Sequence, residues 1–170
     1  MAYSIAALLV LLDQVSKAVI EAVIPYGTGH AAIDGFFYVL NTRNTGAAWS
    51  LLADLTWGHV VLSAVSLIAS VLLAKAIRHS RHNAGTVILG VLLGGSVGNL
   101  IDRVRFGYVT DFLSFRFGSY AFPAFNVADM AITLGALAVV VFALCDKTFL
   151  DRTLPWLNKA GAEPERDASA

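Results

Sequence analysis

The amino-acid sequence predicts an integral membrane protein that is mainly α-helical, with four transmembrane helices and a small β-sheet at the membrane surface. Three observations support this fold class: an apolar composition, four long hydrophobic stretches, and aromatic runs in the connections between them. Of the 170 residues, 57% are hydrophobic and only 14% are charged. This balance excludes a disordered chain and is too apolar for an ordinary soluble domain.

Four hydrophobic stretches approach the length that crosses a bilayer. A hydrocarbon core of about 30 Å requires about 20 helical residues. The stretches are residues 4–24, 57–77, 85–101 and 127–145. They predict one four-span domain over residues 1–146 and a polar cytoplasmic tail over 147–170, whose end has the composition of a disordered segment.

The first stretch is predicted to be a retained helix rather than a cleaved signal peptide. No positive segment precedes it, and Asp13, Gln14 and Lys17 interrupt its apolar run. Asp13, Lys17 and Glu21 recur every four residues, so they share one face of the helix. Charges inside a membrane are costly, so this face must contact protein or water. Two interpretations remain open: a structural ion pair, or direct contact with substrate or catalytic groups.

The distribution of Lys and Arg predicts the orientation. Six lie around the short turn 78–84 or after the last stretch, at Lys75, Arg78, Arg81, Lys147, Arg152 and Lys159. The long connections, 25–56 and 102–126, carry four, at Arg43, Arg103, Arg105 and Arg116. Because positive residues accumulate on the cytoplasmic side, both termini are expected there and both long connections outside.

The long connections contain runs that favour short strands. Residues 35–40 and 112–117 are rich in aromatic and β-branched side chains, and glycine lies beside each run. Aromatic side chains also suit the membrane–water interface. We therefore expect a small sheet on the bilayer surface.

Other site types have little support. The formal net charge is zero, so no basic surface for nucleic acid is predicted. Cys145 is the only cysteine, which excludes an intrachain disulfide, and its apolar surroundings predict a buried thiol. His79 and His82 lie in a basic run without nearby acids, so neither a metal site nor a cofactor is expected.

Polar residues gather where the third stretch ends. Gly90, Gly94 and Gly98 form a ridge that lets another helix approach closely. The ridge is followed by Asn99, Asp102 and Arg103, which share one helical face. This cluster is either a structural network or part of a site.

Two acids flank the last connection. Asp111 follows the third stretch, and Asp129 lies three residues inside the fourth. Asn126 could simply cap that helix, but an acid at the position of Asp129 needs partners. Two carboxyl groups that lie close together can share one proton, as an aspartic peptidase requires.

Five sequence blocks resemble, in order, those of lipoprotein signal peptidase, the signal peptidase II (prolipoprotein signal peptidase) family. They are Asp13-Gln-Val-Ser-Lys17, Asn44-Thr-Gly-Ala-Ala-Trp49, Gly94-Gly-Ser-Val-Gly-Asn-Leu-Ile-Asp-Arg103, Val109-Thr-Asp-Phe112 and Phe125-Asn-Val-Ala-Asp129. The resemblance extends from residue 13 to about residue 132. It departs from the family at Trp49, where phenylalanine is usual, and at Met130, where serine is frequent.

The resemblance implies an aspartic endopeptidase of the bacterial cytoplasmic (inner) membrane, active near the outer leaflet. It would remove signal peptides from diacylglyceryl-modified prolipoproteins by cutting before the lipidated cysteine. The family's catalytic aspartates correspond to Asp111 and Asp129. Its site-lining residues correspond to Asn44, Asn99, Arg103 and Asn126, and its polar framework to Asp13, Lys17 and Asp102. The implied fold has four helices and an extracytoplasmic β-cradle.

Two other classes remain open from the sequence. A proton-coupled small membrane transporter would also carry acids in its spans, but is more often built from internal repeats with acids near the midplane. A non-catalytic membrane scaffold would explain the glycine ridge and the Asp13–Lys17 pair, but not two acids from separate segments. The peptidase interpretation predicts lipid-modified prolipoproteins and membrane lipids as partners, with no nucleic acid and a monomeric enzyme.

Overall fold

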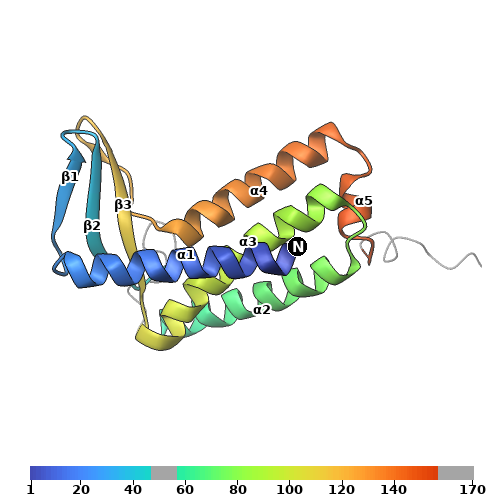
Figure 1. Cartoon of the computed structure of the whole chain (residues 1–170), viewed down its shortest axis with the longest axis horizontal. Helices are drawn as coiled ribbons and strands as arrows, with labels where there is room; N and C mark the ends of the chain where they lie inside the picture. The colour runs from blue at the N-terminus through green and yellow to red at the C-terminus, as the bar shows by residue number, and fades with distance from the viewer. Residues whose placement is uncertain (47–56, 157–170) are drawn as a thin grey trace, which may run out of the picture.

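The computed structural model describes residues 1–46 and 57–156, which form four long helices and a small sheet at one end of them (Figure 1). The helices are α1 (Ala2–Val23), α2 (Gly58–His79), α3 (Asn83–Phe106), α4 (Val127–Cys145) and the short α5 (Phe149–Thr153). The strands are β1 (Gly29–Ile33), β2 (Phe37–Asn44), β3 (Val109–Phe117) and β4 (Tyr120–Ala121). The long helices lie on all four predicted spans.

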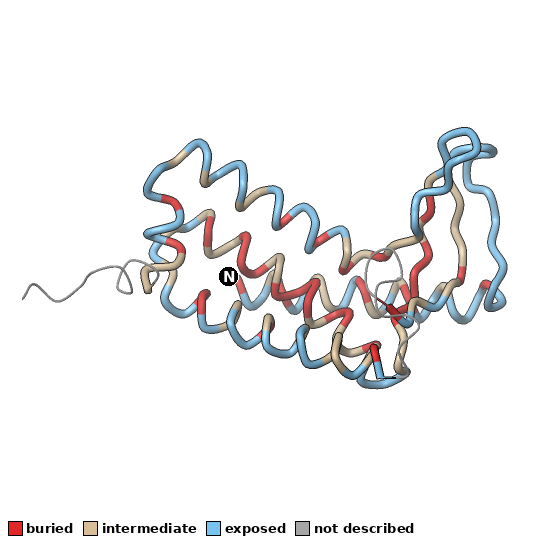
Figure 2. Tube along the Cα trace, turned by 180° about the vertical axis from the view of Figure 1, so that it is seen from behind, coloured by how far each residue is buried: buried red, intermediate tan, exposed pale blue. Residues whose placement is uncertain are grey.

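Helix α3 is the centre of the bundle, because α1, α2 and α4 all pack against it. In the most apolar 18-residue stretch of α3, 56% is buried inside the protein. The corresponding share is 17% in both α2 and α4. Figure 2 shows the same contrast, with buried residues gathered along α3 and exposed residues along the outer helices. Large apolar side chains such as Ile68 and Leu137 are among those that face outward. Such a surface suits lipid rather than water.

Three helices, α2, α3 and α4, are apolar and long enough to cross a membrane. Helix α1 has 22 residues, which is also a sufficient length. It differs from the other three because Asp13, Lys17 and Glu21 lie within it. That α1 spans the membrane therefore stays a prediction.

The predicted glycine ridge lies in the contact between α1 and α3. A side-chain carbon at Gly90 would come 2.6 Å from the carbonyl oxygen of Ala2, and one at Gly98 would come 2.7 Å from Oδ2 of Asp13. Both distances are too short for nonbonded atoms, so only glycine allows this approach. The prediction that the ridge admits a neighbouring helix is confirmed.

The sheet is antiparallel, in the order β1-β2-β3-β4. Strands were predicted at residues 35–40 and 112–117, and β2 and β3 confirm both. Their aromatic side chains pack together, with the rings of Phe37 and Phe115 stacked at 5.0 Å between centroids. The register pairs Thr42 with Asp111, so β2 lies directly beside the strand that carries the first acid.

Several boundaries differ from the prediction. The third span was placed at 85–101, but α3 continues to Phe106 and ends at Gly107, whose φ of 77° is the left-handed conformation that favours glycine. The predicted polar tail begins with the folded helix α5. Cys145 is exposed, so the predicted buried thiol is wrong. Its neighbour Leu144 is exposed as well, so this end of α4 is not covered by the described part of the chain. Trp49 and the end of the tail, 157–170, lie outside the described residues.

Candidate functional site

Asp111 is a buried carboxylate on β3 with a hydrogen-bond donor at each oxygen. Asp111 is only 2% exposed. Nδ2 of Asn44, from the neighbouring β2, donates to Oδ2 at 3.0 Å, and Nδ2 of Asn126 donates to Oδ1 at 2.7 Å. The Thr42 hydroxyl donates to the backbone carbonyl of Asp111 at 2.9 Å and fixes the strand locally.

Asp129 lies in the first turn of α4 and forms a capping box with Asn126. Its backbone N–H donates to Oδ1 of Asn126 at 2.9 Å, while the backbone N–H of Asn126 donates to Oδ2 of Asp129 at 3.2 Å. Nδ2 of Asn99, from α3, donates to the other carboxylate oxygen at 2.7 Å. Asn126 therefore caps the helix, as one interpretation predicted, and also contacts both acids.

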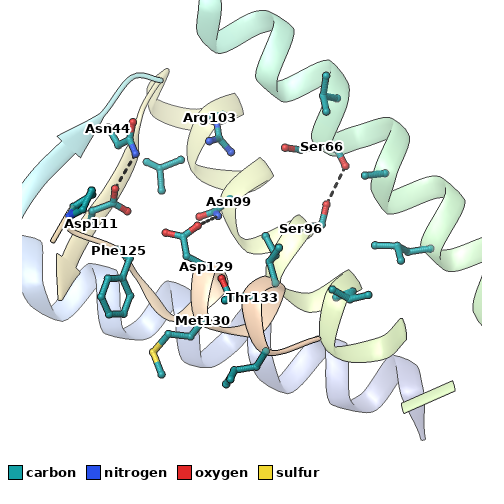
Figure 3. Close-up of a pocket in the computed structure, with 18 of the residues that line it drawn as sticks. Asn44, Ser66, Ser96, Asn99, Arg103, Asp111, Phe125, Asp129, Met130 and Thr133 are labelled. Atoms are coloured by element: carbon teal, nitrogen blue, oxygen red, sulfur yellow. Dashed lines mark hydrogen bonds between the residues drawn. The ribbon is translucent and has the colours of Figure 1, made fainter. Parts of the chain in front are cut away.

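Asn126 and Asn99 connect the two acids through a single set of amide hydrogen bonds. Asn126 is fully buried, and its Nδ2 donates both to Asp111 and, at 3.2 Å, to Oδ1 of Asn99. Nδ2 of Asn99 then donates to Asp129. A strand and two helices thus bring Asp111 and Asp129 to one cavity (Figure 3).

The surroundings of Asp111 favour its protonated form. Burial, followed by the charge of Asp129, raises the pKa of Asp111 to about 7. The amide hydrogen bonds from Asn44 and Asn126 act in the opposite direction on this pKa, because they stabilise the ionised carboxylate. The carboxyl group of Asp111 therefore keeps its proton at pH values where an exposed aspartate has lost it.

Asp13, Lys17 and Asp102 form a buried network behind the two acids. Nζ of Lys17 lies 2.8 Å from Oδ2 of Asp13 and 2.8 Å from Oδ2 of Asp102. It also donates to Oδ1 of Asn99 at 3.2 Å. Because this oxygen accepts from Lys17, the amide nitrogen of Asn99 is turned toward Asp129. The network therefore does more than join α1 to α3: it also orients a residue that contacts an acid.

Gln14 completes this network, and the sequence interpretation did not single it out as a site residue. Its Nε2 donates to Oδ1 of Asp102 at 2.8 Å. Oδ1 of Asp13 accepts from the backbone N–H of Ala128 at 2.9 Å, which ties α1 to the start of α4. Glu21, the third charge of the predicted stripe, accepts from the hydroxyl of Thr110. The position of Gln14 inside the block Asp13-Gln-Val-Ser-Lys17 was the signal that could have identified it.

Arg103 lines the same cavity and is held loosely. Its Nη2 donates to the carbonyl oxygen of Gly46 at 3.4 Å. Within the described ranges, 1–46 and 57–156, it forms no ion pair. Among the described residues, Gly46 is the only acceptor of a hydrogen bond from this guanidinium.

The cavity has a volume of about 1670 Å³ and extends from the two acids along the groove between α2 and α4. Figure 3 shows Met130, Thr133 and Ser96 following the acids along it. Most of its wall is apolar. In the part of the chain that the structure describes, no three His, Cys, Asp or Glu side chains are placed to hold a metal ion. The arrangement can hold a water molecule or a polar group between two acids at the end of an apolar groove.

Comparison with known proteins gives consistent matches. Residues 5–145 match the family described as Signal peptidase (SPase) II. A lipoprotein signal peptidase from Oleidesulfovibrio alaskensis is 41% identical over 140 residues, covering 81% of this chain and 90% of the relative. One from Bacillus pumilus is 37% identical over 144 residues, covering 85% of this chain and 92% of the relative.

Solved structures agree with these sequence matches. A bacterial membrane enzyme determined by the in meso method at 2.3 Å has a TM-score of 0.77 and 29% identity, covering 96% of this chain and 94% of that one. A second, at 1.9 Å, has a TM-score of 0.74 and 32% identity, covering 85% of this chain and 93% of that one.

Proposed function

The chain belongs to the signal peptidase II family, and on that premise we propose that Asp111 and Asp129 are the water-activating pair of an aspartic endopeptidase. The protein is a protease that removes signal peptides from prolipoproteins, and it resides in the bacterial inner membrane. The observation that carries the proposal is the meeting of two carboxyl groups, from β3 and α4, in one cavity. The transporter alternative has no observation in its favour.

The chemistry follows from one shared proton. Two neighbouring carboxyl groups resist double ionisation, so one keeps its proton while the other acts as the base. The raised pKa of Asp111 supports its assignment as the protonated partner. Asp129 then takes a proton from water, the water oxygen attacks the peptide carbonyl carbon, and Asp111 donates a hydrogen bond to the developing oxyanion. When the tetrahedral intermediate collapses, the C–N bond breaks and the amine nitrogen leaves with the proton that Asp129 took from the water, which returns Asp129 to its ionised form.

The neighbouring polar residues position these groups. The side-chain amide of Asn99 holds Asp129 and that of Asn126 holds Asp111, and a further bond joins the two amides. Asn44 holds the second oxygen of Asp111. Arg103 is proposed to bind a substrate carbonyl, either of the peptide or of a lipid ester, because its planar fork suits oxygen acceptors.

The substrate is proposed to be a prolipoprotein that carries a diacylglyceryl group, with cleavage before the lipidated cysteine. The apolar groove leads directly away from the acids, so a lipid-bearing substrate can reach the site from the membrane. We further propose a monomer with both termini in the cytoplasm, so that the sheet and the two acids face the outer leaflet. No cofactor and no nucleic acid partner are proposed.

The proposal is tested by cleavage of a diacylglyceryl-modified prolipoprotein by the purified protein in detergent. Asp111→Asn and Asp129→Asn are each expected to lower kcat by at least about 10³-fold, because general acid–base help and electrostatic stabilisation are both removed. Asp34→Asn, at an exposed turn of the sheet, is the matched control and keeps wild-type activity.

Two outcomes would contradict specific parts of the proposal. If either site variant, correctly folded, cleaves at the wild-type rate, the two acids are not the catalytic pair. If the unlipidated substrate is cleaved as fast as the lipidated one, the diacylglyceryl group is not recognised.

A further inference from the structure

The groove ends, far from the two acids, on the chain segment that follows α4. Leu154 and Trp156 line the cavity together with Leu89 of α3 and Ala76 of α2. Figure 1 shows α5 at the end of the bundle opposite the sheet, between the ends of α2 and α4. The acids and Trp156 are therefore the two ends of one groove.

This segment is firmly attached to the bundle. Phe149 is completely buried, and its ring packs against those of His82 and Phe142, with centroids 5.1 and 5.4 Å apart. The backbone N–H of Arg81 donates to the carbonyl oxygen of Arg152 at 2.7 Å. These contacts fix α5 and hold the residues that follow it against the end of the groove.

Leu154 and Trp156 belong to the hydrophobic core at this end of the bundle. Both pack against the buried cluster that contains Ala76 and Leu89. The Trp156 ring also meets His79, the last residue of α2, edge to face at 6.1 Å. The far end of the groove is thus closed by a defined apolar surface rather than by loose chain.

The length of the groove defines what can occupy it. Asn99 contacts Asp129 at one end of the groove, and Leu89 belongs to the cluster against which Leu154 packs at the other. These two residues are ten positions apart on α3, which corresponds to about 15 Å. An apolar helical segment of about ten residues would fill this distance. Most of the wall between the two ends is apolar, which suits the hydrophobic part of a signal peptide.

We propose that Leu154 and Trp156 form a distal substrate subsite, which contacts the N-terminal end of the apolar segment that precedes the cleavage site. This proposal rests on the proposed function, since the acids define the other end of the bound substrate. The segment after α4 thereby makes the enzyme sensitive to the length of the substrate's apolar segment.

The test uses two lipidated substrates, one with a full-length apolar segment and one shortened at its N-terminal end by about five residues. Trp156→Ala is expected to raise KM for the long substrate about tenfold, with kcat unchanged, because a buried aromatic contact is lost on binding. The short substrate does not reach Trp156, so its KM is expected to stay the same. Leu154→Ala should show the same pattern with a smaller change.

Leu150→Ala is the matched control, since Leu150 lies on α5 but is 40% exposed and does not line the groove. Trp156→Phe keeps most of the packing and should give an intermediate KM for the long substrate. It also serves as the test if Trp156→Ala does not fold. Equal effects on both substrates, or no effect on the long one, would overturn the subsite. Activity in Asp111→Asn would instead overturn the proposed function.

Discussion

The two acids are identical in residue type but are held in different ways. Asp129 is fixed by the start of α4, through a capping box that its own backbone helps to form. Asp111 lies on a strand and receives a side-chain amide at each oxygen. Its protonation therefore depends on contacts that single substitutions can remove.

This difference leads to a prediction for the pH dependence of cleavage. The proton on Asp111 is lost as the pH rises through about 7, so kcat/KM should fall above that pH. Asn44→Ala removes a donor that lowers this pKa, so the alkaline limb should move up by about one pH unit, equivalent to about 1.4 kcal/mol. The measurement is the pH profile of kcat/KM on a lipidated substrate.

The titration of Asp111 should also make the folded protein less stable as the pH rises. The pKa of Asp111 is raised in the folded protein, so its contribution to stability is complete below the unfolded pKa near 4 and declines as the pH rises through about 7. Asp111→Asn removes this titration, so its melting temperature should decline less between pH 4 and 8 than that of the wild type. Parallel profiles for both proteins, and an unmoved alkaline limb in Asn44→Ala, would contradict the assignment.

At the residue scale, sequence reasoning could predict which groups belong together but not how each is oriented. A charged or amide side chain at the edge of an apolar stretch is costly, so it can be identified from the sequence as a candidate site residue. This applies to Asp111, Asn99 and Asp129. The orientation of the Asn99 amide could not be predicted, because Lys17, 82 residues away, determines it. Only the packing of α1 against α3 brings those two side chains together.

At the scale of elements, the contact between α1 and α3 combines close packing with buried charge. The glycine ridge brings the helices together, and Lys17 lies between Asp13 and Asp102. The lysine is 3% exposed, so its two carboxylate partners, together with the amide oxygen of Asn99, must compensate for the loss of water. The helix pair should therefore depend strongly on this one ammonium group.

Lys17→Met tests that dependence. The substitution leaves two buried carboxylates facing each other without a cation, which is expected to cost about 3–5 kcal/mol and lower the melting temperature in detergent by about 6–20 °C. Lys75→Met, at an exposed position on α2, should leave the melting temperature unchanged. Adding Asp102→Asn to Lys17→Met should recover part of the loss. A Lys17→Met variant as stable as the wild type would show that the network is not stabilising.

A helix or strand could be predicted where its own residues show a recognisable pattern of apolar, aromatic or β-branched side chains. Strands β2 and β3 have aromatic and β-branched residues, whereas β1 reads Gly-His-Ala-Ala-Ile, which has no such signal and forms by pairing with β2. Helix α5 has five residues, too few for a periodic pattern, and is held by the burial of Phe149. Strand β4 has only two residues and was also missed. The three missed elements form through contacts with neighbouring parts of the fold rather than through a pattern of their own.

At the scale of the whole molecule, the sheet and α5 lie at opposite ends of the helix bundle (Figure 1). The groove between α2 and α4 connects the acids at the sheet end to Trp156 at the α5 end. If the bundle crosses the membrane, these ends lie on opposite sides of it. The orientation then decides whether a signal peptide can place its cleavage site beside the acids while its N-terminus stays in the cytoplasm.

Labelling with a membrane-impermeant maleimide tests the orientation. In a Cys145→Ser background, Asp34→Cys places a thiol on the exposed β1–β2 turn, and Lys147→Cys places one on the exposed segment before α5. In right-side-out vesicles the thiol at position 34 should react and the thiol at position 147 should not, because Lys and Arg accumulate on the cytoplasmic side. Both should react after detergent is added, which controls for access within the protein. If the thiol at position 147 reacts and the one at position 34 does not, the acids lie on the cytoplasmic side, where a translocated cleavage site could not reach them. If both positions react in sealed vesicles, the two ends of the bundle are not separated by the membrane.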